Sequence, residues 1–196
     1  MLFLFVSCLG GLLVAGLAVP VAGLVNVGGT AVADGMNALP TELETPPQFE
    51  QSKLLMANGK TLATFYEENR IYKELKDISP VMQQAQVAIE DSRFYEHGAL
   101  DLRGTMRALV STAQGATQGG SSITQQYVRL VLVETAVMHN DAKAKFLATE
   151  TSLARKVREL RYAIAVEKKF SKEEILERYL NIAYYGDGAY GVEAAA

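Results

Sequence analysis

The 196-residue sequence predicts a mainly α-helical fold with one small β-hairpin and an apolar N-terminal segment. Three observations lead to this fold class. No charged residue precedes Asp34, and an Asn58-Gly59 pair separates two short apolar runs. From Pro80 onward, apolar residues recur at the spacing of a helix. Apolar residues three and four positions apart form one helical face, and such a face packs against a core.

The uncharged segment at residues 1–33 is long enough to cross a bilayer, which takes ~20 apolar residues. It is longer than the apolar core of a cleaved signal peptide, and no basic residue precedes it. We therefore expect a transmembrane anchor, with a buried core helix as the alternative. The Lys or Arg that usually sets the orientation of such an anchor is missing. Cys8 is the only cysteine, so a disulfide within the chain is excluded.

Residues 34–51 predict an extended linker, because three prolines lie among polar residues there. The following residues 52–72 predict a hairpin, since Asn-Gly between two apolar runs is the strongest short signal for that motif. We therefore divide the chain into an anchor at 1–33, a linker at 34–51 and a folded domain at 52–196.

The apolar spacing after Pro80 predicts five helices. The first is expected to end at Glu90, and the fifth begins with a capping box at Ser171 and Glu174. Residues 191–196 predict the start of a further helix, so we expect the domain to continue beyond them. The five buried faces are expected to consist of Val81, Met82, Ala85, Ala88 and Ile89; Leu102, Met106, Leu109, Val110 and Ala113; Ile123, Tyr127, Leu130 and Val131; Leu153, Val157, Leu160 and Ile164; and Ile175, Leu176, Tyr179, Leu180 and Ala183.

Basic residues concentrate at 143–172, where nine Lys or Arg stand against three Glu. The whole chain has a formal net charge of −3, so this local excess points to an anionic ligand or an anionic membrane surface. A solvated helical face is the alternative interpretation. A mildly acidic chain gives no reason to expect nucleic acid as a partner.

An acidic pair, Glu90-Asp91, closes the first predicted helix and is followed by Phe94 and His97. Glu90 comes directly after an apolar face, so we expect it to be partly buried. Burial can raise the pKa of a carboxylate into the range that suits a general base. Phe94 and His97 would return to the same face if the helix continued. An exposed helix end is the alternative.

Gly119 and Gly120 precede a hydroxyl-rich helix start that contains Ser122. The free N–H groups and the dipole of a helix start favour an anion such as phosphate. A capping box formed by Ser122 and Gln125 is the alternative, and both interpretations can hold at once.

Glu159 lies one helical turn from Arg155 and Lys156. The simple interpretation is an intrahelical salt bridge, worth only roughly 0.2–0.5 kcal/mol. The functional interpretation is a second carboxylate beside cations that neutralise a leaving diphosphate. The residues alone leave both interpretations open.

Four blocks, in order, resemble glycosyltransferase family 51, the peptidoglycan glycosyltransferase domain of class A penicillin-binding proteins and of monofunctional glycosyltransferases. The resemblance covers residues 52–196, and the order of the blocks makes it specific. It implies a lysozyme-like helical domain, and the apolar N-terminal segment suits the same family. The four blocks are Glu90-Asp91-x-x-Phe94-x-x-His97, Gly120-Ser121-Ser122-Ile123-Thr124-Gln125-Gln126, Arg155-Lys156-x-x-Glu159 and Ile175-Leu176-Glu177-x-Tyr179-Leu180-Asn181.

The resemblance implies that the domain polymerises lipid II on the outer face of the cytoplasmic membrane, held by a single-pass anchor. Glu90 would be the general base that deprotonates the acceptor 4-hydroxyl, which then displaces undecaprenyl diphosphate with inversion at the donor sugar. Glu159 would be the second catalytic carboxylate, placed with Arg155 and Lys156 near the diphosphate. A divalent cation, Mg²⁺ or Mn²⁺, would assist there, with Glu159 as a candidate ligand.

By the same resemblance, residues around Glu90 shape the site, and residues of the second block contact the donor. Three positions depart from the usual pattern of the family: Ser122 replaces Thr, Arg129 replaces Lys, and Ala99 stands where glycine is usual. The first two keep a hydroxyl or a charge, although Arg and Lys bind anions with different geometry. The implied substrate-binding residues are Asp91, Phe94, His97, Ser122, Gln126, Arg129, Arg155 and Lys156.

Two other function classes remain open at this point, a lysozyme-like peptidoglycan hydrolase and a non-catalytic, membrane-anchored cell-wall scaffold. The expected partners are lipid II, the growing glycan chain, the membrane, and cell-wall synthesis or division proteins. Residues 115–150 predict either a mobile, membrane-facing segment or a loop followed by a core helix. The fifth block of the family, which carries an Arg, is expected beyond Ala196.

Overall fold

The computed structural model describes residues 42–101, 104 and 120–196. The chain divides into two units, Met1–Pro40 and Thr41–Ala196, and the described residues belong to the second. The predicted anchor and the second predicted helix therefore lie outside the described residues. Among the described residues, no helix is both long enough and apolar enough to span a membrane.

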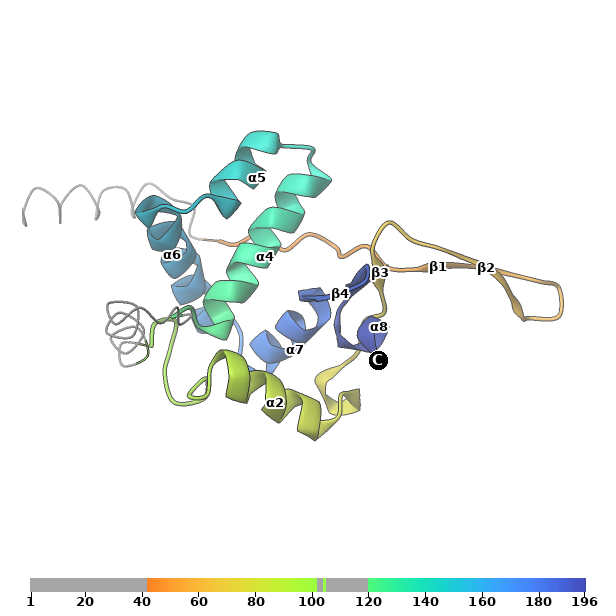
Figure 1. Cartoon of the computed structure of the whole chain (residues 1–196), viewed down its shortest axis with the longest axis horizontal. Helices are drawn as coiled ribbons and strands as arrows, with labels where there is room; N and C mark the ends of the chain where they lie inside the picture. Colours follow the sequence, from red (N-terminus) through yellow and green to blue (C-terminus); the bar gives the residue numbers. More distant parts are fainter. Residues whose placement is uncertain (1–41, 102–103, 105–119) are drawn as a thin grey trace, which may run out of the picture. The chain divides into compact units, whose positions relative to one another are not determined.

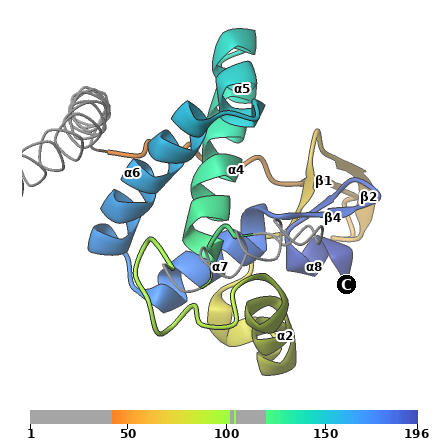
Figure 2. The same cartoon turned by 60° about the vertical axis from the view of Figure 1, so that its left-hand side comes forward.

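Helices form most of the described part of the second unit (Figure 1). Helix α4 runs through its middle and packs against α5, α6 and α7 (Figure 1, Figure 2). Four of the predicted helices are confirmed as α2, α4, α6 and α7. The helices are η1 (Leu75–Asp77, a 3-10 turn), α2 (Pro80–Glu90), α4 (Ile123–Met138), α5 (Ala142–Thr149), α6 (Leu153–Lys169), α7 (Lys172–Ile182) and α8 (Val192–Ala195).

The core lies where α4, α6 and α7 meet. The predicted apolar face of α7 is confirmed, since all five of its residues are buried. Ser171 and Glu174 form the predicted capping box at the start of this helix. In α4, Ile123, Tyr127 and Val131 are buried as predicted. Each fully buried apolar side chain contributes about 1.5–3 kcal/mol, so this contact region supplies much of the folding energy.

The inward face of α6 differs from the prediction. Ile164 is 38% exposed, whereas Glu159, Ala163 and Val166 are buried. The buried face of α6 is therefore rotated from the one that the apolar spacing predicted, because a charged residue, Glu159, takes a buried position. Burial of a carboxylate is tolerated only where it is paired, and Glu159 has such partners in the candidate site.

The apolar face predicted for α2 is wrong, although the helix forms at the predicted residues. Val81 and Ile89 are 75% and 81% exposed, and no residue of α2 is buried. Of the predicted face, Met82 is the residue that packs on the core. Gln83 also points inward, where its amide donates to two backbone oxygens of the preceding segment, at 2.8 Å each. A polar side chain can face inward here because its hydrogen bonds are made.

The apolar run at 130–133 lies inside α4, which continues without a break to Met138. Val131 is 2% exposed, and α5 packs against the same helix. The described residues of 115–150 therefore match the alternative of a core helix, and 115–119 lie outside the described part. Contact of this region with a membrane stays a prediction.

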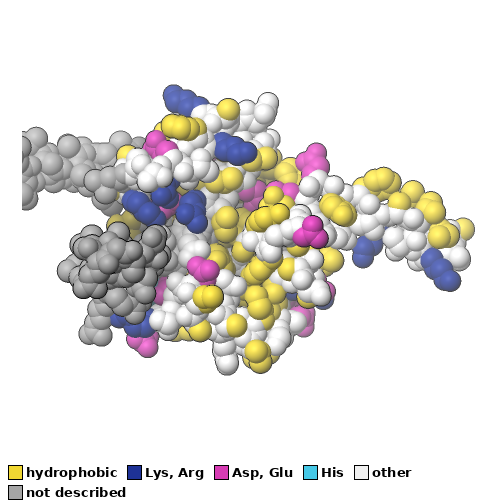
Figure 3. All heavy atoms as spheres, viewed as in Figure 1, with side chains coloured by type: hydrophobic (Ala, Val, Ile, Leu, Met, Phe, Trp, Pro, Cys, Tyr) yellow, Lys and Arg dark blue, Asp and Glu magenta, His cyan; other side chains and the backbone are white. Residues whose placement is uncertain are grey.

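The predicted hairpin is confirmed. Strand β1 (Ser52–Leu55) pairs antiparallel with β2 (Thr61–Phe65), and Gly59 has a φ of +80° in the turn between them. Figure 3 shows apolar side chains along this hairpin, where Leu62 and Phe65 are 59% and 60% exposed. The hairpin therefore adds little to the core.

A second, three-stranded sheet was not predicted. Strand β3 (Asn69–Arg70) lies parallel to β5 (Ala189–Tyr190), which also pairs antiparallel with β4 (Tyr184–Gly186). Strands of two or three residues are too short to show an alternating apolar pattern, so the sequence contained no signal for them. The sheet joins segments that are far apart along the chain.

Arg70 connects this sheet to the helices. It is 1% exposed, and its Nη1 donates to Glu134 Oε1 in α4 at 2.6 Å. Its Nη2 lies 2.9 Å from Glu68 Oε2, and its guanidinium lies 5.5 Å from the centroid of the Tyr190 ring. Burial raises the pKa of Glu68, and the charge of Arg70 opposes that rise. Because a buried charge that loses its partner is costly, this cluster holds β3 and β5 against α4.

Gly191 provides a test of the packing between β5 and α7. Its φ and ψ are 80° and 155°, and a Cβ at this position would lie 2.8 Å from the backbone oxygen of Asn181. We expect Gly191→Ala to lower the free energy of unfolding by about 3 kcal/mol, measured by urea denaturation. Gly188→Ala is the matched control, because Gly188 also has a positive φ but open space around it. Its expected cost is about 1 kcal/mol, and equal losses in the two variants would contradict the steric explanation.

Candidate active site

The chain turns immediately after α2. Asp91 is extended, with a φ of −158°, and Phe94 N donates to Asp91 O at 2.9 Å. The expectation that Phe94 and His97 return to the face of Glu90 along a continued helix is therefore wrong. Phe94 is instead completely buried in the core, and His97 folds back toward Asp91.

The Asp91 carboxylate joins the first sequence block to the second. Its Oδ1 lies 2.8 Å from His97 Nε2, and its Oδ2 accepts a hydrogen bond from Ile123 N at 3.2 Å. Ile123 is the first residue of α4, and a negative charge at a helix start is stabilised by the helix dipole. Asp91 and His97 are thus brought together, and they set the position of Glu90 relative to α4.

Protein groups already occupy the start of α4. Besides the contact with Asp91, the Ser122 hydroxyl accepts from Gln125 N at 3.3 Å as the N-cap. The Ser122 hydroxyl and the Gln125 amide both donate to Ala99 O, at 3.2 and 2.9 Å. Of the capping-box alternative, the N-cap hydrogen bond of Ser122 is therefore confirmed. The reciprocal bond from the Gln125 side chain is replaced by its contact with Ala99 O. The anion beside this helix start is the Asp91 carboxylate, and a phosphate contact there stays a prediction.

Glu90 is exposed, contrary to the expectation of partial burial. The last three residues of α2 are all exposed, and the preceding Ile89 is 81% exposed. Glu90 Oε2 accepts a hydrogen bond from Gln126 Nε2 at 2.8 Å. Gln126 Oε1 in turn accepts from the Tyr179 hydroxyl at 3.2 Å. The first, second and fourth blocks therefore meet at Gln126.

A pocket of about 200 Å³ opens beside Glu90. Its lining comes from the end of α2, from the segment that follows, and from residues 120–122 directly before α4. Polar groups dominate this lining, so the pocket suits a polar ligand such as a sugar. Its polar lining includes Glu90, Asp91, Ser92, Asp101, Ser121 and Ser122.

Glu159 is 2% exposed, and both of its carboxylate oxygens contact cations of α6. Oε1 forms an ion pair with Arg155, and Oε2 lies 3.2 Å from Lys156 Nζ. Lys156 Nζ also donates to Ser121 Oγ at 2.6 Å. The intrahelical salt bridge is thus confirmed, and Ser121 connects the cations of the third block to the pocket beside Glu90.

All four sequence blocks meet at or near the start of α4, and comparison with known families agrees with this convergence. Residues 58–196 match a family model described as Transglycosylase. This chain belongs to that family. The match begins in the β1–β2 hairpin and includes the four blocks and every helix of the described part.

Several bacterial proteins resemble this transglycosylase chain. Penicillin-binding protein 1F of Bacillus subtilis (strain 168) is 37% identical over 147 residues, which cover 74% of this chain and 19% of that protein. Penicillin-binding protein 1A of Escherichia coli (strain K12) is 42% identical over 146 residues, covering 74% and 16%. A monofunctional glycosyltransferase of Staphylococcus saprophyticus is 39% identical over 130 residues, covering 66% and 43%. The chain thus spans about a fifth of these penicillin-binding proteins and less than half of the monofunctional relative.

Two tyrosines lie near Glu90 in this transglycosylase domain. Burial raises the pKa of Tyr179 above its ordinary value and the charge of Glu90 adds to the rise, while the charge of Arg129 opposes it. Burial and then the charge of Glu90 raise the pKa of Tyr185 to about 12. Both phenols therefore keep their protons at neutral pH. Arg129, a predicted donor contact, is partly buried and close enough for its charge to act on Tyr179.

A divalent cation at Glu159 does not fit the arrangement of these residues, because cationic side chains contact both of its oxygens. Elsewhere among the described residues, Asp91, His97 and Asp101 place three potential ligand atoms within 4.8 Å of one another. Those groups already pair with each other or with protein cations, as Asp101 does with Arg93 at 2.6 Å. The use of Mg²⁺ or Mn²⁺ stays a prediction, and no step proposed below depends on it.

A second group of contacts joins the elements that carry the transglycosylase site. Thr124 Oγ1 donates to Glu167 Oε1 at 2.5 Å, and Lys172 Nζ lies 2.7 Å from the same oxygen. Lys172 Nζ also lies 4.4 Å from the centroid of the Phe94 ring, a cation–π distance. These contacts therefore hold the start of α4 against the end of α6 and against the segment after Glu90.

Several of these residues were missed by reasoning from the sequence. Ser121 stands beside the predicted Ser122, but its contact with Lys156 depends on how α6 packs. Tyr179 was predicted only as a core residue. A buried tyrosine usually finds a polar partner for its hydroxyl, and that signal could have marked it as a site residue.

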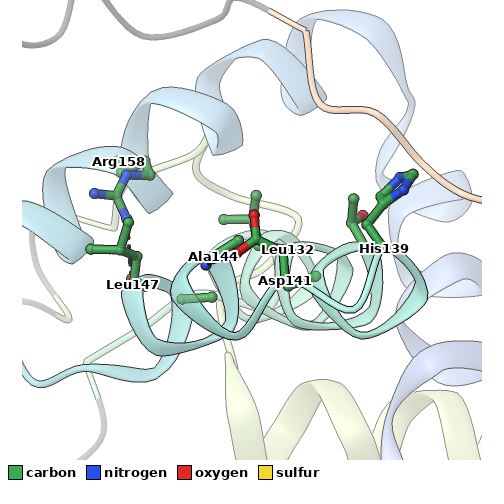
Figure 4. Close-up of a pocket in the computed structure, with 9 residues that line it drawn as sticks. Leu132, His139, Asp141, Ala144, Leu147 and Arg158 are labelled. Atoms are coloured by element: carbon green, nitrogen blue, oxygen red, sulfur yellow. Dashed lines mark hydrogen bonds between the residues drawn. The ribbon is translucent and has the colours of Figure 1, made fainter.

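A separate pocket of about 370 Å³ lies between α4, α5 and α6. Figure 4 shows Arg158 and Leu147 at one end of this pocket and His139 at the other, with Leu132, Asp141 and Ala144 between them. None of the predicted site residues lines this pocket. It is therefore not part of the candidate active site.

Asp101→Asn tests the electrostatics of the segment after Glu90. Burial favours a higher pKa for Asp101, but the Gly104 N–H and the charge of Arg93 lower the pKa below its ordinary value of 3.8. A lowered pKa stabilises the fold above that ordinary value, and the stabilisation is lost as the pH falls through the folded-state pKa. We therefore expect the variant to unfold at lower urea concentration than wild type at neutral pH, with the difference shrinking in acid. Asp77→Asn, at an exposed carboxylate, is the control, and a loss independent of pH would contradict the explanation.

Proposed function

We propose that this chain is a peptidoglycan glycosyltransferase that polymerises lipid II by inverting sugar transfer. The family supports this class of enzyme. The observation that carries the proposal is the hydrogen bond of 2.6 Å from Lys156 Nζ to Ser121 Oγ, because it brings the cations of α6 to the pocket that contains Glu90. Transfer from a sugar diphosphate needs one group to accept a proton and another to neutralise the leaving group.

Glu90 acts as the general base in this proposal. Its carboxylate is exposed in the lining of the pocket, so the 4-hydroxyl of an acceptor sugar can reach it. The hydroxyl proton passes to Glu90 while the hydroxyl oxygen forms a bond to C1 of the donor sugar. The bond from C1 to the diphosphate oxygen breaks, and undecaprenyl diphosphate leaves with the bonding electrons. Attack from the side opposite the leaving group inverts C1, so no covalent sugar–enzyme intermediate is needed.

Lys156 and Arg155 neutralise the charge on the leaving diphosphate. The side chain of Lys156 is 41% exposed and can contact the substrate directly, whereas that of Arg155 is 11% exposed. Glu159 lies buried behind both cations and holds them in place. We therefore assign Glu159 a positioning role, instead of the direct catalytic role that the resemblance implied. Preorganised cations of this kind lower the barrier because they meet charge that grows in the transition state.

The predicted substrate contacts divide by burial into residues that support the site and residues that a substrate can reach. Asp91 and Phe94 are buried, and they hold the segment that carries Glu90 in place. Ser122 is buried as the cap of α4. The predicted contacts that stay partly exposed, and so keep their proposed role toward substrate, are His97, Gln126 and Arg129.

The proposed reaction takes place on the outer face of the cytoplasmic membrane, because the lipid tail keeps the substrate there. The uncharged residues 1–33 are proposed as a single-pass anchor, with 34–51 as the linker and 52–196 as the catalytic domain. The partners are then lipid II, the growing glycan chain and the membrane. Cell-wall synthesis or division proteins are the proposed protein partners.

The Glu90→Gln variant tests the base. We expect the rate of lipid II polymerisation in proteoliposomes to fall roughly 10²–10⁴-fold, because the amide cannot accept the hydroxyl proton. Glu96→Gln is the matched control, since Glu96 is an exposed carboxylate in the segment that follows. A Glu90→Gln protein that polymerised at the wild-type rate would remove Glu90 as the base.

The same assay separates the proposed activity from its alternatives. Polymer formed from lipid II, without cleavage of finished glycan, supports the transferase. Release of fragments from finished glycan would indicate a hydrolase instead. If neither reaction occurs, the non-catalytic scaffold is the remaining alternative.

Lys156→Met tests the cation beside the pocket. We expect kcat/KM for lipid II to fall roughly 10–100-fold, because a charge-assisted hydrogen bond to diphosphate is worth about 1.5–3 kcal/mol. Methionine keeps the apolar stem, so the packing of α6 should change little. Lys143→Met removes an exposed cation of α5 and should change kcat/KM by less than about twofold. Equal losses in both variants would mean that only the overall positive charge matters.

A further inference from the structure

Tyr179 and Glu90 are connected through a single side chain, Gln126. The Tyr179 hydroxyl donates to Gln126 Oε1 at 3.2 Å, and Gln126 Nε2 donates to Glu90 Oε2 at 2.8 Å. We infer that Tyr179 is a positioning residue for the transfer reaction: it fixes the amide of Gln126, and this amide holds the base. The inference rests on the function proposed above, and it assigns a role to a residue of the core.

The orientation of the Gln126 amide is decisive because its two ends differ chemically. The oxygen only accepts hydrogen bonds and the nitrogen only donates them. A flipped amide would place its oxygen against the Glu90 carboxylate, acceptor against acceptor. The Tyr179 hydroxyl opposes this flip because it donates to the oxygen. Nε2 also lies 3.4 Å from Ser121 O, a second acceptor that favours the same orientation.

Tyr179 is well suited to fix an amide because it is itself immobile. It is 4% exposed and lies on the buried face of α7, between Leu176 and Leu180, and α7 packs against α4. Burial and the charge of Glu90 raise the pKa of the phenol, so the hydroxyl remains a donor at neutral pH.

Glu90 has the opposite character. It is the last residue of α2, and its side chain is exposed. Ordering an exposed glutamate side chain costs about 1–2 kcal/mol of conformational entropy. The donor from Gln126 restricts the carboxylate to one part of the pocket. Because a catalytic group misplaced by about 1 Å can lose roughly 100-fold in rate, the orientation of this amide affects the chemical step.

Tyr179→Phe keeps the ring and removes only the hydroxyl. We expect kcat for lipid II polymerisation to fall roughly tenfold while KM stays within about twofold, since Tyr179 is buried and does not contact substrate. In a Gln126→Ala background the same substitution should cause no further loss, because its effect passes through Gln126. Losses that multiply in the double variant, or a change confined to KM, would overturn the inference.

Tyr72→Phe is the matched control. Tyr72 is also a phenol with a side-chain partner, but its hydroxyl donates to Glu177 Oε1 at 2.5 Å and not to Gln126. Any loss that this variant causes should therefore multiply with the loss from Gln126→Ala. A vanishing effect of Tyr72→Phe in that background would mean that the coupling is not specific to Tyr179.

The side-chain amide of Gln126 gives a readout that does not depend on activity. In ¹⁵N-labelled protein, the NMR signal of this amide should shift in Tyr179→Phe and in Glu90→Gln, but not in Tyr72→Phe. An amide signal unmoved by Tyr179→Phe would refute the relay, whereas a wild-type protein that fails to polymerise lipid II would refute the proposed function. If Tyr179→Phe does not fold, Gln126→Ala should show the same drop in kcat, and an unchanged kcat there would also refute the relay.

Discussion

The hydrogen bond from the Ile123 amide to the Asp91 carboxylate fixes the start of α4, and the site is built around that point. Ser121, Thr124 and Gln126 lie at or near this helix start. Ser121 and Thr124 contact α6, and Gln126 contacts α2. The carboxylate belongs there because the first N–H groups of a helix lack partners within the helix and carry partial positive charge. Loss of this one anion would leave a buried donor unpaired, at a cost of about 1–3 kcal/mol. It would also loosen the contacts that Ser121, Thr124 and Gln126 make from this helix start.

Two carboxylates of the site have opposite surroundings, and their roles follow from the difference. Glu90 is exposed and has a neutral amide donor, so it is open to a substrate hydroxyl. Glu159 is buried between Arg155 and Lys156, so its charge holds these two cations in place, and in the proposed reaction they would face the leaving group. Carboxylates in the same enzyme commonly take different tasks when their environments differ in this way.

Local signals predicted much of the fold, and contacts between distant segments account for what they missed. The hairpin turn at Asn58-Gly59 and the cap at Ser171 depend on neighbouring residues alone, so the sequence revealed them. The faces of α2 and α6 were mispredicted because glutamines and Glu159 turn inward, which is favourable only once their partners are in place. The sequence blocks named most residues of the candidate site. They could not indicate that Glu90 is exposed or that Tyr179 contacts Gln126, because both depend on how α2 and α7 pack against α4.

The pairing of β3 with β5 has a consequence for how the protein is made. The segment before α2 is held by late parts of the chain, as the contact of Lys73 N with Asn181 Oδ1 shows, 108 positions apart at 2.8 Å. A nascent chain emerges from its N-terminus, so the partners of Lys73 in α7 and of β3 in β5 become available only after residues 181–190 have been synthesised. Contacts between such distant positions also form slowly. We therefore expect the segment before α2 to reach its final place only after residue 190 has been synthesised.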